Sequence, residues 1–141
     1  NTHSTGAFGT THDAHPLEPA MPAPSPITRL HVATRYSDAA IHNGTVYLAG
    51  QVADDATQDI VGQTQQVLAT IDRLLTEAGS NKSRILMTQI FLADLADFDG
   101  MNSVWDAWVA PDHAPPRATV QALLARPEWR IEIVVTAAAG S

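Results

Sequence analysis

Residues 84–92 read RILMTQIFL, and this segment carries the clearest information about the fold. Successive side chains of a β-strand point to opposite faces, so the apolar residues divide between the two. One face would hold Leu86, Ile90 and Leu92, and the other Ile85, Met87 and Phe91. A strand that is apolar on both faces must be covered on both. The segment therefore predicts a central strand with helices on one side and another cover on the opposite side.

An amphipathic helix is predicted before this strand. Asp59 is a suitable N-cap, and Gly79 is a suitable residue to follow the last helical turn. Between them, apolar and small residues recur at the three- and four-residue spacing that places them on one side of a helix. That side consists of Thr64, Val67, Leu68, Ile71, Leu74, Leu75 and Ala78.

A second helix is predicted after the central strand. It would begin at about Phe98, with Asp97 as its N-cap. Its buried side would hold Met101, Trp105 and Trp108. The proline-rich segment 111–116 ends it, because proline lacks the amide hydrogen that a helix interior requires.

Short strands are predicted on both sides of the helical segments. Three precede the first helix, over 27–33, 39–42 and 46–49, and Asn43-Gly44 is typical of a hairpin turn. Two more follow the second helix. The order is then βββαβαββ, and the fold class is α+β, with a mixed sheet covered on one face by two helices. The apolar residues of the other face would be buried against further copies of the chain.

Residues 1–26 differ in composition from the rest of the chain. Five of the nine prolines fall here, and the apolar content is too low to offset the entropy of ordering the segment. We expect a mobile N-terminal tail followed by one domain over 27–141. Met21 looks like a natural start, so the residues before it could be an addition to the natural protein.

Composition disfavours several classes of function. Eight Lys and Arg against 15 Asp and Glu give a net charge of −7, which argues against nucleic acid as a partner. With no cysteines, disulfides, thiolate metal sites and cysteine nucleophiles are excluded. No glycine-rich phosphate loop supports a nucleotide cofactor, and the histidines are too scattered to predict a metal site. No apolar run reaches the roughly 18 residues of a membrane span, so we expect a cytoplasmic protein without membrane, cofactor or metal.

Two charged residues stand inside the last two predicted strands. Arg117 follows Pro115-Pro116, and Glu132 lies between two isoleucines. An ionised side chain among apolar neighbours needs a partner or a function. Arginine can hold a carboxylate with both arms of its guanidinium, and glutamate can activate water, so the pair suggests hydrolysis of a small anionic metabolite. The alternatives are structural: Arg117 could pair with Glu132 or with a neighbouring acid, and Glu132 could pair with Arg130 or Arg117 or be exposed at a sheet edge.

Three further residues are suited to binding a ligand. Gly50 closes the strand 46–49 and would allow close approach of a ligand, or simply turn the chain. Tyr36 lies in a loop, where its phenol could bind a substrate or be partly buried. Asn102 is a mediocre helix former in mid-helix, which a hydrogen bond to a loop or to a ligand would explain.

In combination and order, these segments resemble the RidA/YjgF family along residues 34–139. The resemblance is carried by Leu48-Ala49-Gly50-Gln51, the apolar spacing of 63–79, Phe91-Leu92-Ala93-Asp94, Pro116-Arg117 and Ile131-Glu132-Ile133. Finer details are similar to the YoaB-like branch of that family, namely Arg35-Tyr36-Ser37-Asp38 and Trp105-Asp106-Ala107-Trp108.

The resemblance implies a chorismate-mutase-like α+β fold, assembled as a homotrimer with active sites between subunits. It also implies hydrolysis of reactive 2-imino or enamine acids to 2-keto acids and ammonia, without a cofactor. The carboxylate-binding arginine would be Arg117 and the water-activating glutamate Glu132. The substrate-binding residues would be Tyr36, Gly50, Phe98, Asn102 and Thr119, and Thr119 stands where the best-known members have cysteine.

One departure from the family bears on substrate range. The loop 52–58 is shorter than in the best-known imine deaminases, which changes the expected shape of the pocket. A second hypothesis is therefore a regulatory or metabolite-binding trimer that holds keto acids without turnover. Ribonuclease activity, a third hypothesis attached to family members, is disfavoured by the acidic charge and the lack of paired histidines.

Overall fold

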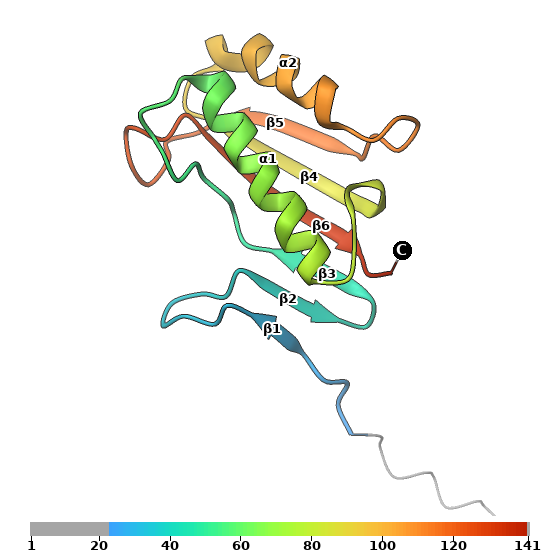
Figure 1. Cartoon of the computed structure of the whole chain (residues 1–141). Helices are drawn as coiled ribbons and strands as arrows, with labels where there is room; N and C mark the ends of the chain where they lie inside the picture. Colours follow the sequence, from blue (N-terminus) through green and yellow to red (C-terminus); the bar gives the residue numbers. More distant parts are fainter. Residues whose placement is uncertain (1–22, 141) are drawn as a thin grey trace, which may run out of the picture.

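The structure is a computed structural model that describes residues 23–140 (Figure 1). Most of the expected N-terminal tail, residues 1–22, lies outside the described part of the chain. Residues 23–26 are exposed and form neither helix nor strand. From there the strands and long helices follow in the predicted order βββαβαββ.

A six-stranded sheet forms one layer of the molecule. The strands are β1 (Thr28–Leu30), β2 (Ala39–His42), β3 (Thr45–Leu48), β4 (Ile85–Leu92), β5 (Arg117–Gln121) and β6 (Ile131–Ala138). They lie side by side in the order β1-β2-β3-β6-β4-β5. Only β4 and β5 run parallel among these neighbouring strands, so the sheet is mixed, as predicted.

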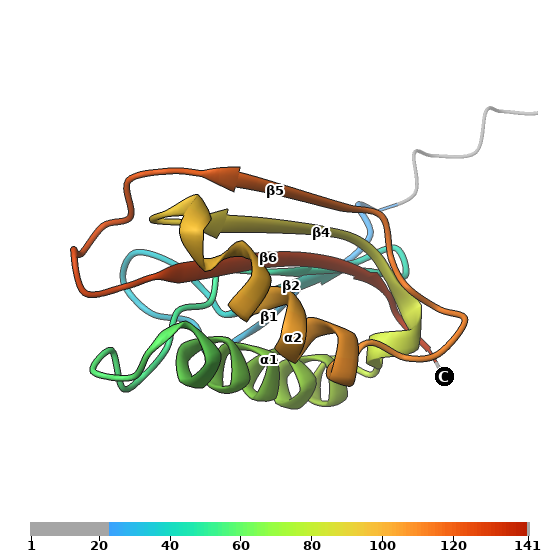
Figure 2. The ribbon, with the colours of Figure 1, turned by 90° about the horizontal axis from the view of Figure 1, so that it is seen from above.

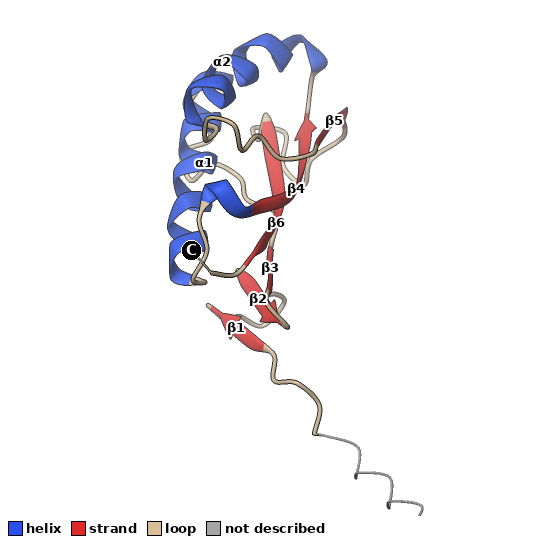
Figure 3. Ribbon diagram, turned by 90° about the vertical axis from the view of Figure 1, so that its right-hand side faces the viewer, coloured by secondary structure: helices blue, strands red, loops and turns tan. Residues whose placement is uncertain are grey.

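Two helices form the second layer, α1 (Ile60–Glu77) and α2 (Phe98–Trp108). Figures 2 and 3 show both helices on the same side of the sheet. Every residue of the predicted apolar side of α1 is buried, which confirms the spacing argument. On α2, Met101 and Trp105 are buried, whereas Trp108 is half-buried and donates its indole N–H to Asp72 on α1 at 2.9 Å.

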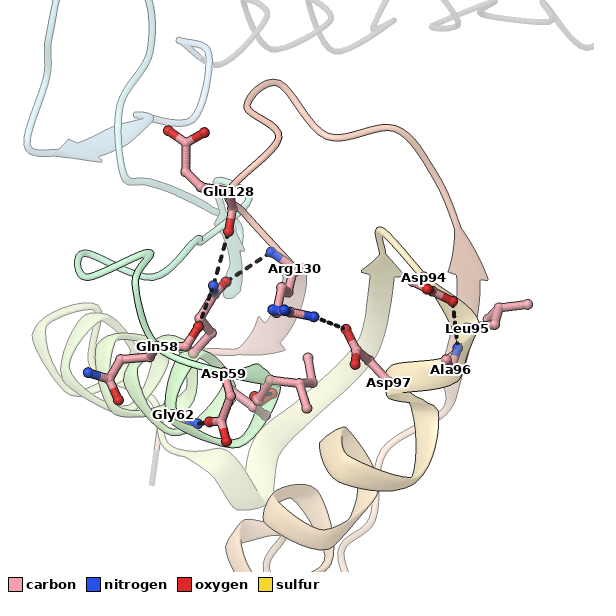
Figure 4. A network of polar contacts seen from close by, with 12 residues as sticks. Gln58, Asp59, Gly62, Asp94, Leu95, Ala96, Asp97, Glu128 and Arg130 are labelled. Atoms are coloured by element: carbon pink, nitrogen blue, oxygen red, sulfur yellow. Dashed lines mark hydrogen bonds and ion pairs between the residues drawn. The ribbon is translucent and has the colours of Figure 1, made fainter.

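The predicted ends of the first helix and the predicted hairpin turn are confirmed. The carboxylate of Asp59 accepts a hydrogen bond from the amide of Gly62 at 2.9 Å, as an N-cap does (Figure 4). Gly79 has a φ of 78°, the left-handed conformation expected just past a helix end. Asn43 and Gly44 have φ values of 48° and 78°, which match a hairpin turn with two left-handed residues.

The predicted face assignment within β4 is wrong at its first residues. A register shift lies between Ile85 and Met87, so one extra residue interrupts the alternation. Ile85 is therefore buried on the helix side with Ile90 and Leu92, whereas Leu86 is 51% exposed. A bulge depends on pairing with the neighbouring strand β6, and the periodicity of β4 by itself does not contain it.

Asp97 occupies the N-cap position of α2, as predicted, but its side chain does not act as a cap. Asp97 makes no capping hydrogen bond, because it belongs to a short 3-10 helix, η2 (Leu95–Asp97), that leads into α2. The capping contact occurs earlier, where Asp94 accepts from the amide of Ala96 at 2.8 Å (Figure 4). Asp97 is instead paired with Arg130 at 3.3 Å, which ties the start of α2 to the segment before β6.

The second face of the sheet carries large apolar side chains without a helix over them in the described part of the chain. Tyr47 on β3, Met87 on β4 and Val120 on β5 are 52%, 42% and 48% exposed. We call this side of the sheet the open face. Exposed apolar area of this kind is typical of an interface, so burial against other copies remains the prediction.

Strand β1 ends earlier than predicted because His31 adopts a left-handed backbone conformation, with a φ of 55°. Its imidazole pairs with the carboxylate of Glu77 at the last turn of α1. The hydrogen bond and the charge of Glu77 together raise the pKa of His31 above its ordinary value, with a smaller contribution from Asp38. The pair fastens the edge of the sheet to the end of α1.

Replacement of His31 should remove a pH-dependent part of the stability. Because the folded-state pKa of His31 is raised, its contribution is present at low pH and is lost as pH rises through that pKa. In urea unfolding, the stability advantage of wild type over His31→Gln should be greatest below the ordinary histidine pKa of 6.5 and should shrink as pH rises above it. A difference between the two proteins that does not change with pH would contradict this assignment.

Candidate active site

Arg117 begins β5 and points towards the helical layer. Its strand partner is Thr88, which is wholly buried. One terminal nitrogen of the guanidinium donates a hydrogen bond to Oδ1 of Asn102 at 2.8 Å. The guanidinium carbon lies 5.1 Å from the centre of the Trp105 ring, within reach of a cation–π interaction. Two side chains of α2 thus hold the arginine, and it keeps further N–H groups that could bind a carboxylate.

The side of α2 that faces Arg117 is regular. Phe98, Asn102 and Trp105 are four and three residues apart, so they lie on one side of the helix. Phe98 stands at the first turn and is 39% exposed. Asn102 is held by Arg117, which accounts for an asparagine in mid-helix.

The two prolines before Arg117 set its position on the sheet. Proline restricts the backbone on both sides of it, so the chain enters β5 extended. The carbonyl of Pro116 accepts the amide of Thr88 at 3.0 Å, and this bond starts the parallel pairing of β5 with β4. Arg117 therefore occupies the first paired position of an edge strand.

Thr119 follows two residues later on the same side of β5. Its hydroxyl is buried and has no hydrogen-bond partner among the described residues, and the hydroxyl of Thr88 is in the same situation. Buried hydroxyls normally find partners. Two threonine hydroxyls on the strands around Arg117 are therefore left without a hydrogen bond within the described residues and could bind a ligand.

Glu132 lies in β6 and faces the open side of the sheet. Its neighbours Ile131 and Ile133 are wholly buried on the helix side, and alternation places Glu132 on the other side. The side chain rests against Gly50, where a Cβ atom would lie 2.7 Å from Oε2 of Glu132. A side chain at position 50 would therefore force the carboxylate of Glu132 to move.

A bulge brings Gly50 to this position. Tyr47 pairs with Thr136, and Gln51 pairs with Ile133. Gln51 lies four positions after Tyr47, whereas Ile133 lies three positions before Thr136. The β3 side of the ladder therefore contains one extra residue. The extra residue lets the backbone at Gly50 run beside Glu132.

Within one chain, Arg117 and Glu132 do not meet. They lie on opposite faces of the sheet, with β4 between their strands. Among residues 23–140 neither forms an ion pair, so the alternative of a structural pair between them is not realised in the described chain. Glu132 is also not on an edge strand, because β6 is flanked by β3 and β4.

Tyr36 belongs to the Glu132 side of the molecule. It is 65% exposed in the loop between β1 and β2. With Arg35, Tyr47 and Ala49 it lines a hollow that ends next to Gly50. The predicted residues therefore form two groups: one holds Arg117, Phe98, Asn102 and Thr119 beneath or along α2, and the other holds Glu132, Gly50 and Tyr36.

Gln63 on α1 is an important residue that the sequence argument missed. It is wholly buried, and its two amide N–H groups are shared among the carbonyls of Ala56, Gln58 and Glu128, which lie 3.0 to 3.1 Å from the nitrogen. Its oxygen accepts the amide of Arg130 at 2.9 Å. One side chain thus fastens the loop after Gly50 and the segment before Glu132. A polar residue at the apolar spacing of α1, one turn before Val67, was the available signal.

The short loop 52–58 is fixed by local contacts. Asp55 accepts hydrogen bonds from the hydroxyl and the amide of Thr57, at 2.6 and 3.1 Å, and its own amide donates to Gln66 on α1. The Thr57 hydroxyl is the main cause of the lowered pKa of Asp55. Ala53 is buried at 3% exposure and anchors the loop on the core. The wall of the site beside Gly50 is therefore well defined.

Residues 23–140 contain no group of three or more His, Cys, Asp or Glu side chains placed to hold a metal ion. None of the helices described is long and apolar enough to span a membrane.

The sequence model of the endoribonuclease L-PSP family matches residues 26–139. The chain belongs to this family. It is 54% identical over 112 residues to a RutC family protein of Haemophilus ducreyi, across 79% of this chain and 96% of that protein. It is 49% identical over 112 residues to the RutC family protein YoaB of Escherichia coli, across 79% and 97%. It is 33% identical over 108 residues to the 3-aminoacrylate deaminase RutC of Acinetobacter baylyi, across 72% and 85%.

A crystal structure from the same family agrees with the fold. The YjgF family member NMB1025 of Neisseria meningitidis is 44% identical and superimposes with a TM-score of 0.81, covering 84% of this chain and 99% of that one. The resemblance to the RidA/YjgF family, with its YoaB-like relatives, is confirmed. Membership of the family also fits the sheet with helices on one face.

Replacement of Gly50 by alanine should strain the protein through Glu132. The new Cβ would lie 2.7 Å from Oε2 and 2.9 Å from Cδ of Glu132, so the carboxylate must move. We expect Gly50→Ala to lower the free energy of unfolding by about 1 kcal/mol in urea titrations. In a Glu132→Ala background the collision is absent, and Gly50→Ala should cost little. Equal costs in both backgrounds would contradict the contact.

Proposed function

We propose that the protein hydrolyses reactive 2-imino and enamine acids to 2-keto acids and ammonia, in clefts between the subunits of a homotrimer. The observation that supports this most directly is the division of the predicted site into two groups on opposite faces of one sheet. Arg117 has a neutral hydrogen-bond partner and no carboxylate partner in the described chain. A second copy that covered the open face could bring its Arg117 group to the Glu132 group of the first.

The two groups supply complementary parts of a hydrolysis. The guanidinium of Arg117, oriented by Asn102 and the Trp105 ring, would bind the substrate carboxylate with two parallel hydrogen bonds. Glu132, on the neighbouring copy, would orient a water molecule and accept its proton. Backbone groups near Gly50 and Thr119 would hold the imine nitrogen and the water.

Hydrolysis of an imine needs only an activated water molecule and proton transfers. A protonated imine carbon is already electrophilic, so water activated by Glu132 adds to it to form a carbinolamine. The nitrogen takes up the proton held by Glu132 and leaves as ammonia, while the hydroxyl group gives up its own proton and the carbon–oxygen double bond forms. Water and a protonated imino acid thus give a 2-keto acid and ammonium, with no electrons transferred to or from the protein.

The comparisons support this class of reaction. One relative, 33% identical, is named a 3-aminoacrylate deaminase, and 3-aminoacrylate is an enamine acid. More similar relatives are named only as RutC family proteins. The alternative is a trimer that binds a keto acid in the same cleft without turnover.

Loss of Arg117 should abolish most of the activity. We expect Arg117→Ala to lower kcat/KM for 2-iminopropanoate, generated in situ by an amino acid oxidase, by about 30-fold or more. Glu132→Gln should lower kcat by about 100-fold or more, because a general base is lost. Arg126→Ala, at an exposed loop arginine, is the matched control and should retain the wild-type rate. An undiminished rate for Arg117→Ala would exclude the carboxylate-binding role, and saturable keto-acid binding without any turnover would select the alternative.

Mixing two inactive variants tests whether the site is shared between subunits. In trimers randomly assembled from equal amounts of Arg117→Ala and Glu132→Gln chains, about one site in four would receive an intact Arg117 and an intact Glu132 from different copies. We therefore expect activity to recover to roughly a quarter of wild type after unfolding and refolding together. Separately refolded variants, mixed afterwards, are the control. No recovery on co-assembly would show that both residues act from one chain.

A further inference from the structure

A hollow at one end of the open face contains two arginines that the proposed mechanism does not use. Its wall is formed by the loop between β1 and β2 and by the adjoining strands, and it includes Arg29, Arg35, Tyr36, Tyr47 and Ala49. Strand pairing explains the arrangement. Arg29 pairs with Ala40, and Ala40 pairs with Tyr47, so these three side chains share the open face.

Neither arginine of the hollow has a polar partner among the described residues. Within residues 23–140, Arg29 and Arg35 form no ion pair and no side-chain hydrogen bond, and both are exposed. Three other arginines have such contacts, whereas Arg73 and Arg126, which are also exposed, have none among the described residues. Arg84 donates to two backbone carbonyls near the C-terminus, Arg117 donates to Asn102, and Arg130 pairs with Asp97.

The overall charge makes this local concentration of cations notable. The chain has a net charge of −7, and only eight Lys and Arg residues, yet two of them line one hollow. An anionic ligand is repelled by the field of the whole chain unless positive groups oppose it locally. Two guanidiniums and two phenols in one concavity supply both charge and hydrogen-bond donors for a carboxylate.

The hollow adjoins the Glu132 group of the proposed site. The loop that carries Arg35 and Tyr36 leaves β1 after Leu30, and Leu30, Ala39 and Leu48 are successive partners across three strands. The loop therefore lies at the same end of the sheet as Gly50, two residues beyond Leu48. An anionic group in the hollow would lie beside a substrate whose reacting carbon is near Glu132.

We propose that this hollow binds the second carboxylate of the substrate, and that Arg35, assisted by Arg29, gives the protein a preference for dicarboxylic imino acids. The inference rests on the proposed function, because it assigns the first carboxylate to Arg117 and the reacting carbon to the Glu132 side. The favoured substrates are the 2-imino acids formed from acidic amino acids, and the products are 2-keto dicarboxylates.

The test compares two keto acids that differ in the second carboxylate. Titration calorimetry at fixed ionic strength should show 2-oxoglutarate binding about tenfold more tightly than 2-oxobutanoate, because hydrogen bonds between charged groups are the stronger kind. In Arg35→Gln the ratio of the two affinities should fall to about one, and Arg35→Lys should retain part of it. The matched control is Arg73→Gln, at an exposed arginine of the helical layer, which should keep the wild-type ratio.

Turnover measurements separate this inference from the proposed function. The kcat/KM for 2-iminoglutarate should exceed that for 2-iminopropanoate in wild type, and the ratio should fall in Arg35→Gln and in Arg29→Gln. Equal affinities for the two keto acids, or a preference that survives both substitutions, would overturn the hollow as a carboxylate site even if both imines are hydrolysed. A preference that depends on Arg35, without turnover of either imine, would uphold the hollow and reject the hydrolase.

Discussion

Alternation of side chains along β6 is the constraint on which the rest of the structure depends. Ile131, Ile133, Val135 and Ala137 are almost wholly buried against the helices, and the residues between them are half-buried on the open face. Because β6 lies between β3 and β4, its register fixes both halves of the sheet. A slip of one residue would expose the core face and turn Glu132 into the helical layer, so burial of the apolar residues also holds the glutamate on the open face.

The same constraint separates the two charged groups that the sequence singled out. Arg117 is on the helix side because its partner Thr88 is there, and it is retained by Asn102 and Trp105 on α2. Glu132 is on the other side, next to Gly50. A sheet is too thick for side chains on opposite faces to cooperate, so a shared function requires two copies. This geometry connects the exposed apolar residues of the open face with the proposed catalysis.

Much of the fold could be predicted from the sequence, and the failures have definite physical causes. The buried side of α1, the cap at Asp59 and the turn at Asn43-Gly44 depend on local periodicity and backbone preference, and all are confirmed. The bulge after Ile85 depends on pairing between strands far apart in the sequence. Gln63 was missed because its four hydrogen bonds reach two loops, one of which is more than 60 residues away.

The sequence by itself determined the order of the elements, the family and the identity of the candidate residues, because these depend on residue types and their spacing along one chain. Only the tertiary structure decided which side of the sheet each candidate occupies, that Asn102 binds Arg117, and that Arg29 and Arg35 line one hollow beside Gly50. The physical reason is that strand pairing and bulges set side-chain direction through contacts between distant segments. Local pattern places a charge in a strand, and register decides what that charge can reach.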